Sequence, residues 1–233
     1  MNKQYNQSEQ YEHLTVDDLD IVLDAMNPDL KSILTLNASQ LYLAGGFIRA
    51  VLNGEDVADV DIFGLDVGGV THAAYDYAGW LGSMATVHET PCTLTVEHPH
   101  HIPVQFVNDV PYATPAECIS QFDFSVCQAV IWWDGTEWCS LCSPQFYQDI
   151  QDRVLRYTSP ERREAAGGSL WRAFKYSRRG YSISQMTLAA LITRLNSGMK
   201  KATEDQEDGW VWTTPEVERD AVIKSFKNGR SYC

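Results

Sequence analysis

The stretch that decides the fold is LYLAGGFIRAVLNGEDVADVDIFG, Leu41 to Gly64. Its apolar start, residues 40–44, predicts a strand that ends at Gly45 and Gly46. A helix is expected directly after the glycines and is expected to end at Gly54. A strand, two glycines and a helix leave unpaired N–H groups at the helix N-terminus, and glycine lets an anionic phosphate approach the backbone closely.

The same stretch ends in a second expected strand that carries two aspartates, Asp59 and Asp61. Period-two alternation places both carboxylates on one face of this strand, roughly 6.6 Å apart along it. Such oxygen ligands suit Mg²⁺, and two ions about 3.5–4 Å apart can clamp the attacking and leaving oxygens of an in-line displacement. A turn alone would explain the glycines, and a solvated strand edge would explain the aspartates. Their combination in this order favours a nucleotide site.

The rest of the chain predicts an α+β fold. A front part with mixed helices and strands, residues 1–143, is expected to be followed by a helical part, residues 144–233. Hydrophobic periodicity and turn residues predict helices over 15–26, 72–84, 144–157, 169–181 and 183–195, strands over 93–96 and 102–107, and a buried run over 124–133.

Composition is that of an ordinary globular protein of 233 residues, with 44% hydrophobic and 21% charged residues. No apolar run approaches the roughly 20 residues of a membrane helix, and the polar N-terminus lacks the apolar region of a signal peptide. Six irregularly spaced cysteines are typical of reduced thiols rather than of a disulfide framework. The sequence therefore predicts a cytoplasmic protein without a membrane partner.

The formal charge of −13 argues against a general nucleic-acid coat protein, because phosphate contacts need Lys and Arg. The charge is unevenly distributed. Residues 153–179 hold eight Lys or Arg and two Glu, a net charge of +6, which leaves −19 for the remainder. Local fields matter more than totals for an anionic ligand, although a solvated helical face would explain the same run.

Four blocks of the chain resemble the polymerase-beta-type nucleotidyltransferases, and most closely the head and neck of class II CCA-adding enzymes and bacterial poly(A) polymerases. They occur in the family's order. The blocks are AGGFIRAVLNGEDVADVDIF (44–63), FDFSVCQAVIWWDG (122–135), YQDIQDRVLRYTSP (147–160) and SLWRAFKYSRRGYSIS (169–184). The resemblance implies a small mixed nucleotidyltransferase sheet flanked by helices and followed by a short helical neck. The domains would be an ancestral nucleotidyltransferase head, residues 1–143, and a helical neck and C-terminal region, residues 144–233. This compact form is similar to proteins encoded by tailed bacteriophages.

The resemblance also implies roles for individual residues of the first block. Gly45 and Gly46 would hold the β- and γ-phosphates of a nucleoside triphosphate. Asp59 and Asp61 would ligate magnesium, and one of them would help deprotonate or position the acceptor hydroxyl. Arg49 would support the phosphates or orient Asp59, with a surface salt bridge as the open alternative.

Later residues are assigned in the same way. Asp123 would anchor the ribose or structure the pocket, with a strand-end cap as an equal alternative. Arg172, Lys175 and Arg179 are spaced i, i+3 and i+7 on one expected helix face and could meet the triphosphate or the acceptor backbone. Where many superfamily members place a third carboxylate on a later strand, this chain has Gln105.

The departures from the family concern substrate selection. The paired arginines before Asp123 are replaced by Gln121 and Phe122, and the family's asparagine is replaced by Cys127. The block that selects cytosine or adenine falls on Ala165, Ala166 and Ser169, which cannot read a base edge in that way. The chain also stops short of the body and tail that measure tRNA. Nucleotide transfer is therefore expected without the CCA reaction itself.

Two functions follow as expectations. The first is a Mg²⁺-dependent nucleotidyltransferase that moves a nucleoside monophosphate from an NTP to an acceptor hydroxyl. An RNA 3′ end, such as that of a tRNA-like molecule, is the favoured acceptor, and a protein side chain or a small molecule stays open. The alternative is a catalytically degraded binding or regulatory protein of the same fold that acts on a host system.

Overall fold

The computed structural model describes residues 11–158 and 166–197, and the side chains of 168–194 within the latter range. The described residues form two compact units. The first contains residues up to Phe122 together with Val126–Ile150, and the second contains Asp123–Ser125 together with the residues from Gln151 onward. Sequence predictions for the tail beyond residue 197 lie outside the described residues.

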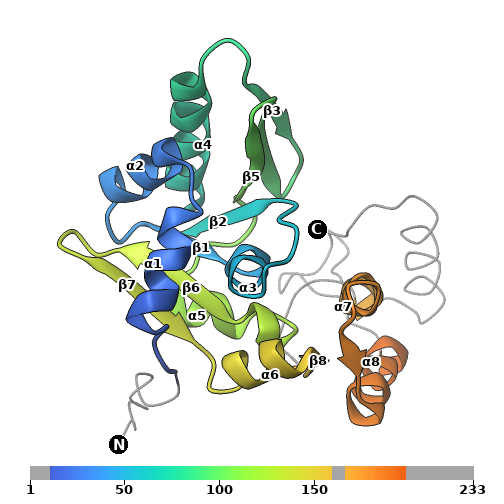
Figure 1. The fold of residues 1–233 in the computed structure, drawn as a ribbon. Coiled ribbons are helices and arrows are strands. Elements are labelled where there is room, and N and C mark those ends of the chain that lie inside the picture. The colour runs from blue at the N-terminus through green and yellow to red at the C-terminus, as the bar shows by residue number, and fades with distance from the viewer. Residues whose placement is uncertain (1–10, 159–165, 198–233) are drawn as a thin grey trace, which may run out of the picture. The chain divides into compact units, whose positions relative to one another are not determined.

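A seven-stranded mixed sheet forms the centre of the first unit (Figure 1). Its spatial order is β3-β4-β5-β2-β1-β6-β7, in which β2 and β5 are parallel and the other neighbours are antiparallel. The strands are β1 Leu41–Ala44, β2 Val60–Gly64, β3 Thr86–Glu89, β4 Thr93–His98, β5 His101–Val107, β6 Ala129–Trp133 and β7 Trp138–Cys142. The predicted α+β class and mixed sheet are confirmed.

The helices of this unit begin where the sequence supplies caps. Thr15 accepts a hydrogen bond from the N–H of Asp18 at the start of α1, and Asn27 accepts one from Asp29 at the start of α2. Asp66 caps α4 in the same way through Gly69. The helices are α1 Val16–Asp24, α2 Pro28–Leu36, α3 Gly46–Leu52, α4 Val67–Leu81, α5 Pro115–Ser120 and α6 Phe146–Asp152, with a 3₁₀ turn η2 at Ser125–Cys127.

The two faces of the sheet differ in what covers them. On one face Tyr42, Ala44 and Phe63 pack with Cys118 and Ile119 of α5. The other face is covered by α2 and α4 and includes buried apolar residues such as Leu30, Val60, Tyr77 and Phe106. Because cross-strand partners share a face, Asp61 lies on the α5 face with its partner Ala44.

The second unit is helical with a small parallel pairing. Helices α7 Ala166–Ser177 and α8 Gln185–Ser197 accompany strands β8 Val154–Leu155 and β9 Ser182–Ile183. The predicted helix over 144–157 is therefore too long, since α6 ends at Asp152. Arg153 adopts φ 51°, a left-handed conformation that ends the helix and starts β8.

Within the described ranges, no helix is long and apolar enough to cross a bilayer.

Candidate functional site

Asp59, Asp61 and Gln105 come together at the middle of the first unit's sheet. Asp61 belongs to β2 and has Ala44 of β1 and Gln105 of β5 as cross-strand partners. Asp59 immediately precedes β2, and Gln105 Nε2 donates a hydrogen bond of 3.2 Å to Asp59 Oδ2. Both aspartates are half-buried. The structure thus places Gln105 directly beside the two aspartates.

Gly45 links β1 to α3 in a conformation that favours glycine, with φ 90° and ψ −140°. A Cβ at this position would lie 3.6 Å from Asp61 Oδ2 and 3.2 Å from Cε1 of Phe122. Gly45 and Asp61 are therefore neighbours. The N–H of Gly45 donates to the carbonyl of Ala129 at 3.1 Å, so its contribution to a ligand site is open space rather than this amide.

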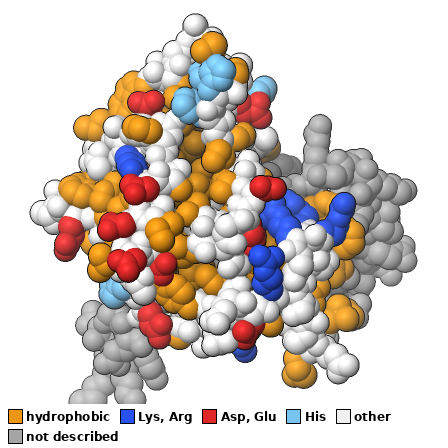
Figure 2. Space-filling model, viewed as in Figure 1, with side chains coloured by type: hydrophobic (Ala, Val, Ile, Leu, Met, Phe, Trp, Pro, Cys, Tyr) orange, Lys and Arg blue, Asp and Glu red, His pale blue; other side chains and the backbone are white. Residues whose placement is uncertain are grey.

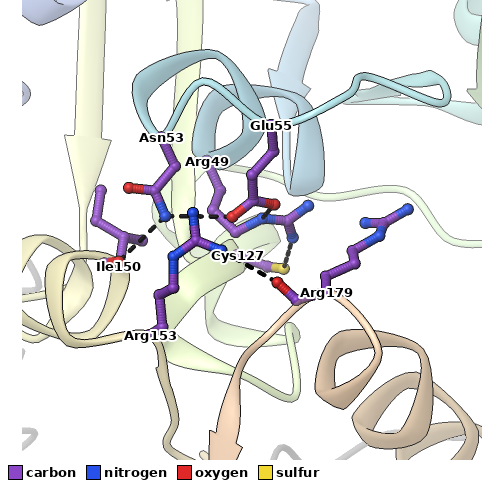
Figure 3. A network of polar contacts seen from close by, with 7 residues as sticks. All are labelled: Arg49, Asn53, Glu55, Cys127, Ile150, Arg153 and Arg179. Carbon is purple, nitrogen blue, oxygen red and sulfur yellow. Dashed lines mark hydrogen bonds and ion pairs between the residues drawn. The ribbon is translucent and has the colours of Figure 1, made fainter.

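Arg49 lies in a buried polar network rather than on the surface (Figure 3). It is 1% exposed, and its Nε lies 3.2 Å from Oε2 of Glu55 in an ion pair. Its Nη1 donates to Sγ of Cys127 at 3.5 Å. The surface salt bridge considered from the sequence is thus a buried one. The partner Glu55 was not singled out, because it lies six residues further on, beyond the reach of simple helix periodicity.

Phe122 takes the place of a family arginine beside the glycine turn. Its ring packs edge-on against Phe63, with centroids 5.5 Å apart and planes at 85°, and Phe63 meets Tyr112 similarly at 5.9 Å. The Phe122 ring borders Gly45, and all three rings belong to the cluster on the sheet face that carries Asp61. The sequence marked Phe122 as a departure but did not indicate that its ring would contact the turn.

The remaining predicted residues belong to the second unit. Asp123 is buried and forms an ion pair with Arg172 of α7, with Oδ2 and Nε 2.6 Å apart. Lys175 and Arg179 are exposed. The prediction that Arg172, Lys175 and Arg179 share one helix is wrong for Arg179, because α7 ends at Ser177.

The helix ends early for a local reason. Gly180 has φ 89°, and the N–H of Tyr181 donates back to the carbonyl of Tyr176, as in a left-handed helix C-terminus. Arg179 lies in this turn, with its guanidinium 5.8 Å from the ring centroid of Tyr176. In the base-selection block, Ala165 lies outside the described residues and Ser169 is buried in α7.

The part of the chain that carries Asp59 and Asp61 is strongly acidic. Residues 11–150 contain twenty Asp or Glu but only two cationic residues, Lys31 and Arg49. Acidic side chains are scattered over α1 and its surroundings (Figure 2). Such a surface attracts divalent cations and disfavours direct contact with phosphate.

The donor set can be compared with what a metal ion requires. No group of three His, Cys, Asp or Glu suited to a metal occurs in the described part of the chain. Asp59 and Asp61 supply two carboxylates, and the third position is the amide of Gln105. Two hard oxygen donors fit Mg²⁺, which binds proteins through one or two carboxylates and takes its other ligands from water and substrate phosphates.

A cavity of about 240 Å³ lies on the other face of the sheet, lined by Met26, Leu30, Val60 and Tyr77 together with residues of the β4–β5 turn. Val60 separates it from the carboxylates of Asp59 and Asp61, which point to the opposite face. The cavity is therefore separate from the candidate site.

Comparison with known proteins gives both a family and a fold. A family model described as "Gabija anti-defense 2 family protein" matches residues 8–153, well over half of the chain. No curated protein matches.

Several solved structures share the fold. A Thermotoga maritima CCA-adding enzyme complexed with tRNA is similar over 81% of this chain and 46% of its own, with 16% identity and a TM-score of 0.55. A tRNA nucleotidyltransferase complexed with a primer tRNA and an incoming ATP analogue is similar over 68% of this chain and 47% of its own, with 23% identity and a TM-score of 0.52. The chain thus spans less than half the length of either enzyme. At these identities the likeness establishes a nucleotidyltransferase-type fold, as expected from the sequence.

Proposed function

Because this chain belongs to the Gabija anti-defense 2 family and has the fold of CCA-adding enzymes, we propose that it is a Mg²⁺-dependent nucleotidyltransferase that counters Gabija defence. It would move a nucleoside monophosphate from an NTP to an acceptor hydroxyl, with an RNA 3′ end as the proposed acceptor. The proposed working parts are the head, residues 1–143, and the neck, residues 144–233.

The observation that carries this proposal is the grouping of Asp59, Asp61 and Gln105 beside Gly45. Asp61 of β2 lies beside the turn after β1, where the missing Cβ of Gly45 leaves room next to its carboxylate. Asp59 directly precedes the same strand. Gln105 holds Asp59 by a hydrogen bond without adding a third negative charge. This arrangement can bind a metal-bound triphosphate from the sheet's α5 face.

The chemistry assigned to these residues is an in-line displacement. The acceptor oxygen attacks the α-phosphorus, the bond to pyrophosphate breaks, and the hydroxyl proton passes to Asp59 or Asp61. Magnesium held by these aspartates would supply charge neutralisation for the phosphates. Gly45 and Gly46 would let the phosphates approach the backbone, and Arg49 would contribute positive charge.

In the second unit, the proposed contacts are with the nucleotide and the acceptor. Arg172, Lys175 and Arg179 would meet phosphates, and Asp123, which holds Arg172 at 2.6 Å, would orient it and could reach the ribose. Arg suits such contacts because its planar fork matches phosphate oxygens.

A second candidate function is antagonism by binding, without catalysis. It is favoured by Phe122, whose ring lies beside Gly45 and which, by sequence resemblance, replaces a family arginine. An acidic first unit with little cationic surface is also better suited to a basic protein partner than to phosphate. The family description, anti-defense, is compatible with either mode.

One pair of substitutions separates the two functions. Asp59→Asn with Asp61→Asn removes the metal ligands while keeping side-chain size. If the protein is an enzyme, the double variant loses transfer of radiolabelled NMP to total cellular RNA by at least 100-fold, and it no longer restores phage growth in cells that carry Gabija. Retained protection with transfer abolished would establish the binding mode instead.

The matched control is Asp56→Asn, an exposed carboxylate in the same loop. It should leave both readouts at wild-type level, because Asp56 lies outside the Asp59–Asp61 pair. Full transfer activity in the Asp59/Asp61 double variant would place the catalytic site elsewhere.

A further inference from the structure

A buried polar network holds the positively charged guanidinium of Arg49 next to the glycine turn. Arg49 Nε contacts Oε2 of Glu55 at 3.2 Å, while Nδ2 of Asn53 donates to Oε1 of the same carboxylate at 3.2 Å. Asn53 Nδ2 also donates to the carbonyl of Ile150 at 3.1 Å. Both oxygens of Glu55 are thus engaged by residues of α3 and its C-cap, and Asn53 ties this corner to α6 (Figure 3).

The ion pair is oriented with respect to Gly46. A Cβ placed on Gly46 would lie 3.5 and 3.7 Å from Nη1 and Nη2 of Arg49, within ordinary contact distance. Glu55 binds the Nε side of the guanidinium. The terminal nitrogens lie against the glycine turn, and Nη1 also donates to Sγ of Cys127. The pair is therefore a fixed dipole whose positive end faces Gly46.

A positively charged side chain is rare in this part of the chain. Among the charged residues of 11–150, Arg49 is the single arginine, and the other cation, Lys31, lies on α2. Burying an arginine is unfavourable unless a carboxylate and further hydrogen bonds compensate it. Replacing a buried ion pair by apolar residues is often neutral or stabilising, so stability alone does not account for this pair.

We infer that Glu55 and Asn53 are positioning residues that hold the Arg49 guanidinium against the Gly45–Gly46 turn for a triphosphate bound there. This inference rests on the proposed nucleotidyltransferase function. Glu55 fixes the plane of the guanidinium through Nε, and Asn53 fixes the plane of the Glu55 carboxylate. Without them, Arg49 keeps its charge but loses the orientation that presents its terminal nitrogens.

The test measures binding of magnesium with a non-hydrolysable ATP analogue by calorimetry, so that it does not depend on turnover. Glu55→Ala is expected to weaken binding at least 10-fold, and Asn53→Ala about 3-fold, since Asn53 acts through Glu55. In an Arg49→Ala background, Glu55→Ala should add less than 2-fold, because the positioning residue has nothing left to position. Independent, additive losses would overturn the inference.

Two further variants serve as controls for folding and for a general effect of removing a carboxylate. Arg49→Met with Glu55→Met replaces the buried pair by apolar side chains, so it should fold with a wild-type melting temperature and still bind the analogue at least 10-fold more weakly. Glu117→Gln, a carboxylate at the start of α5 outside the network, should bind like wild type. Wild-type binding in a folded Glu55 variant overturns the positioning role alone. Failure of the wild-type protein to bind the analogue overturns the proposed function, and the inference with it.

Discussion

At the scale of single residues, the candidate site depends on how much space and how much charge lie next to Asp59 and Asp61. Gly45 keeps the space beside Asp61 open, and Phe122 limits that space from the other side. Gln105 is a neutral partner of Asp59, so it adds no negative charge to a unit that is already acidic. Under the proposed function, these three residues would limit which phosphate or metal can reach the two aspartates.

Gly45→Ala is predicted to destabilise the protein by about 1–3 kcal/mol, because L residues rarely adopt φ 90° with ψ −140°. The new methyl group would also lie 3.2 Å from the Phe122 ring. Urea unfolding measures the change.

Gly46→Ala is the matched comparison. Its Cβ would make ordinary contacts of 3.5 Å and more at a helical position, so its unfolding midpoint should be close to wild type or higher. Equal destabilisation by both substitutions would contradict the conformational explanation.

At the scale of elements, turns and caps bring distant strands into register. The β6–β7 hairpin is closed by Asp134, whose Oδ1 accepts hydrogen bonds from the N–H groups of Thr136 and Glu137 at 2.7 and 2.9 Å. This hairpin matters for the site because β6 pairs with β1, the strand that leads into Gly45. The Asp134 turn, which fixes one end of β6, therefore also stabilises the glycine turn at Gly45.

The backbone N–H of Glu137, then the N–H and hydroxyl of Thr136, lower the pKa of Asp134 from 3.8 to about 2. A carboxyl whose pKa is lower in the folded state stabilises the protein above its unfolded pKa. That stabilisation is lost as the pH falls from about 4 to about 2. NMR titration of the Asp134 carboxyl carbon should therefore show a midpoint near 2.

The substitution Asp134→Ala should lower the unfolding midpoint at neutral pH, with a smaller difference from wild type as the pH approaches 2. Asp109→Ala, which also removes an exposed carboxylate, serves as the control. A titration midpoint near 4 for Asp134 would contradict the hydrogen-bond explanation.

At the scale of the whole molecule, charge is the dominant property. The formal charge of −13 is concentrated in the first unit, while the basic residues cluster between 153 and 179. Close pairs such as Arg49–Glu55 and Asp123–Arg172 are compensated locally. The remaining surface carboxylates repel one another at distances that salt can screen.

The melting temperature is therefore predicted to rise by a few degrees when sodium chloride is raised from about 10 mM to about 150 mM, over which the Debye length shrinks from about 30 to about 8 Å. Differential scanning fluorimetry provides the measurement. Sodium sulfate at matched ionic strength would separate general screening from chloride binding. A falling melting temperature would mean that attractive ion pairs dominate the surface energetics.

Local sequence patterns predicted several of the helices and strands of the first unit. The glycine pair, the alternation around Asp59 and Asp61 and the Thr15 cap predicted β1, α3, β2 and α1, because each depends on neighbours in the chain. The mixed sheet followed from the resemblance and is confirmed. The short strand β3 was not expected, since its residues are mostly exposed and its hydrogen bonds come from β4.

Tertiary structure alone decided which side chains meet. Glu55 with Arg49, Phe122 with Gly45, Gln105 with Asp59 and Arg172 with Asp123 are partners set by strand pairing and packing between segments, and no local period encodes them. The early end of α7 depends on the left-handed Gly180, and that of α6 on the positive φ of Arg153. The sequence thus predicted which types of residue form the site. It did not predict their contacts, because a buried charge is stable only next to a compensating group, and tertiary packing decides which group that is.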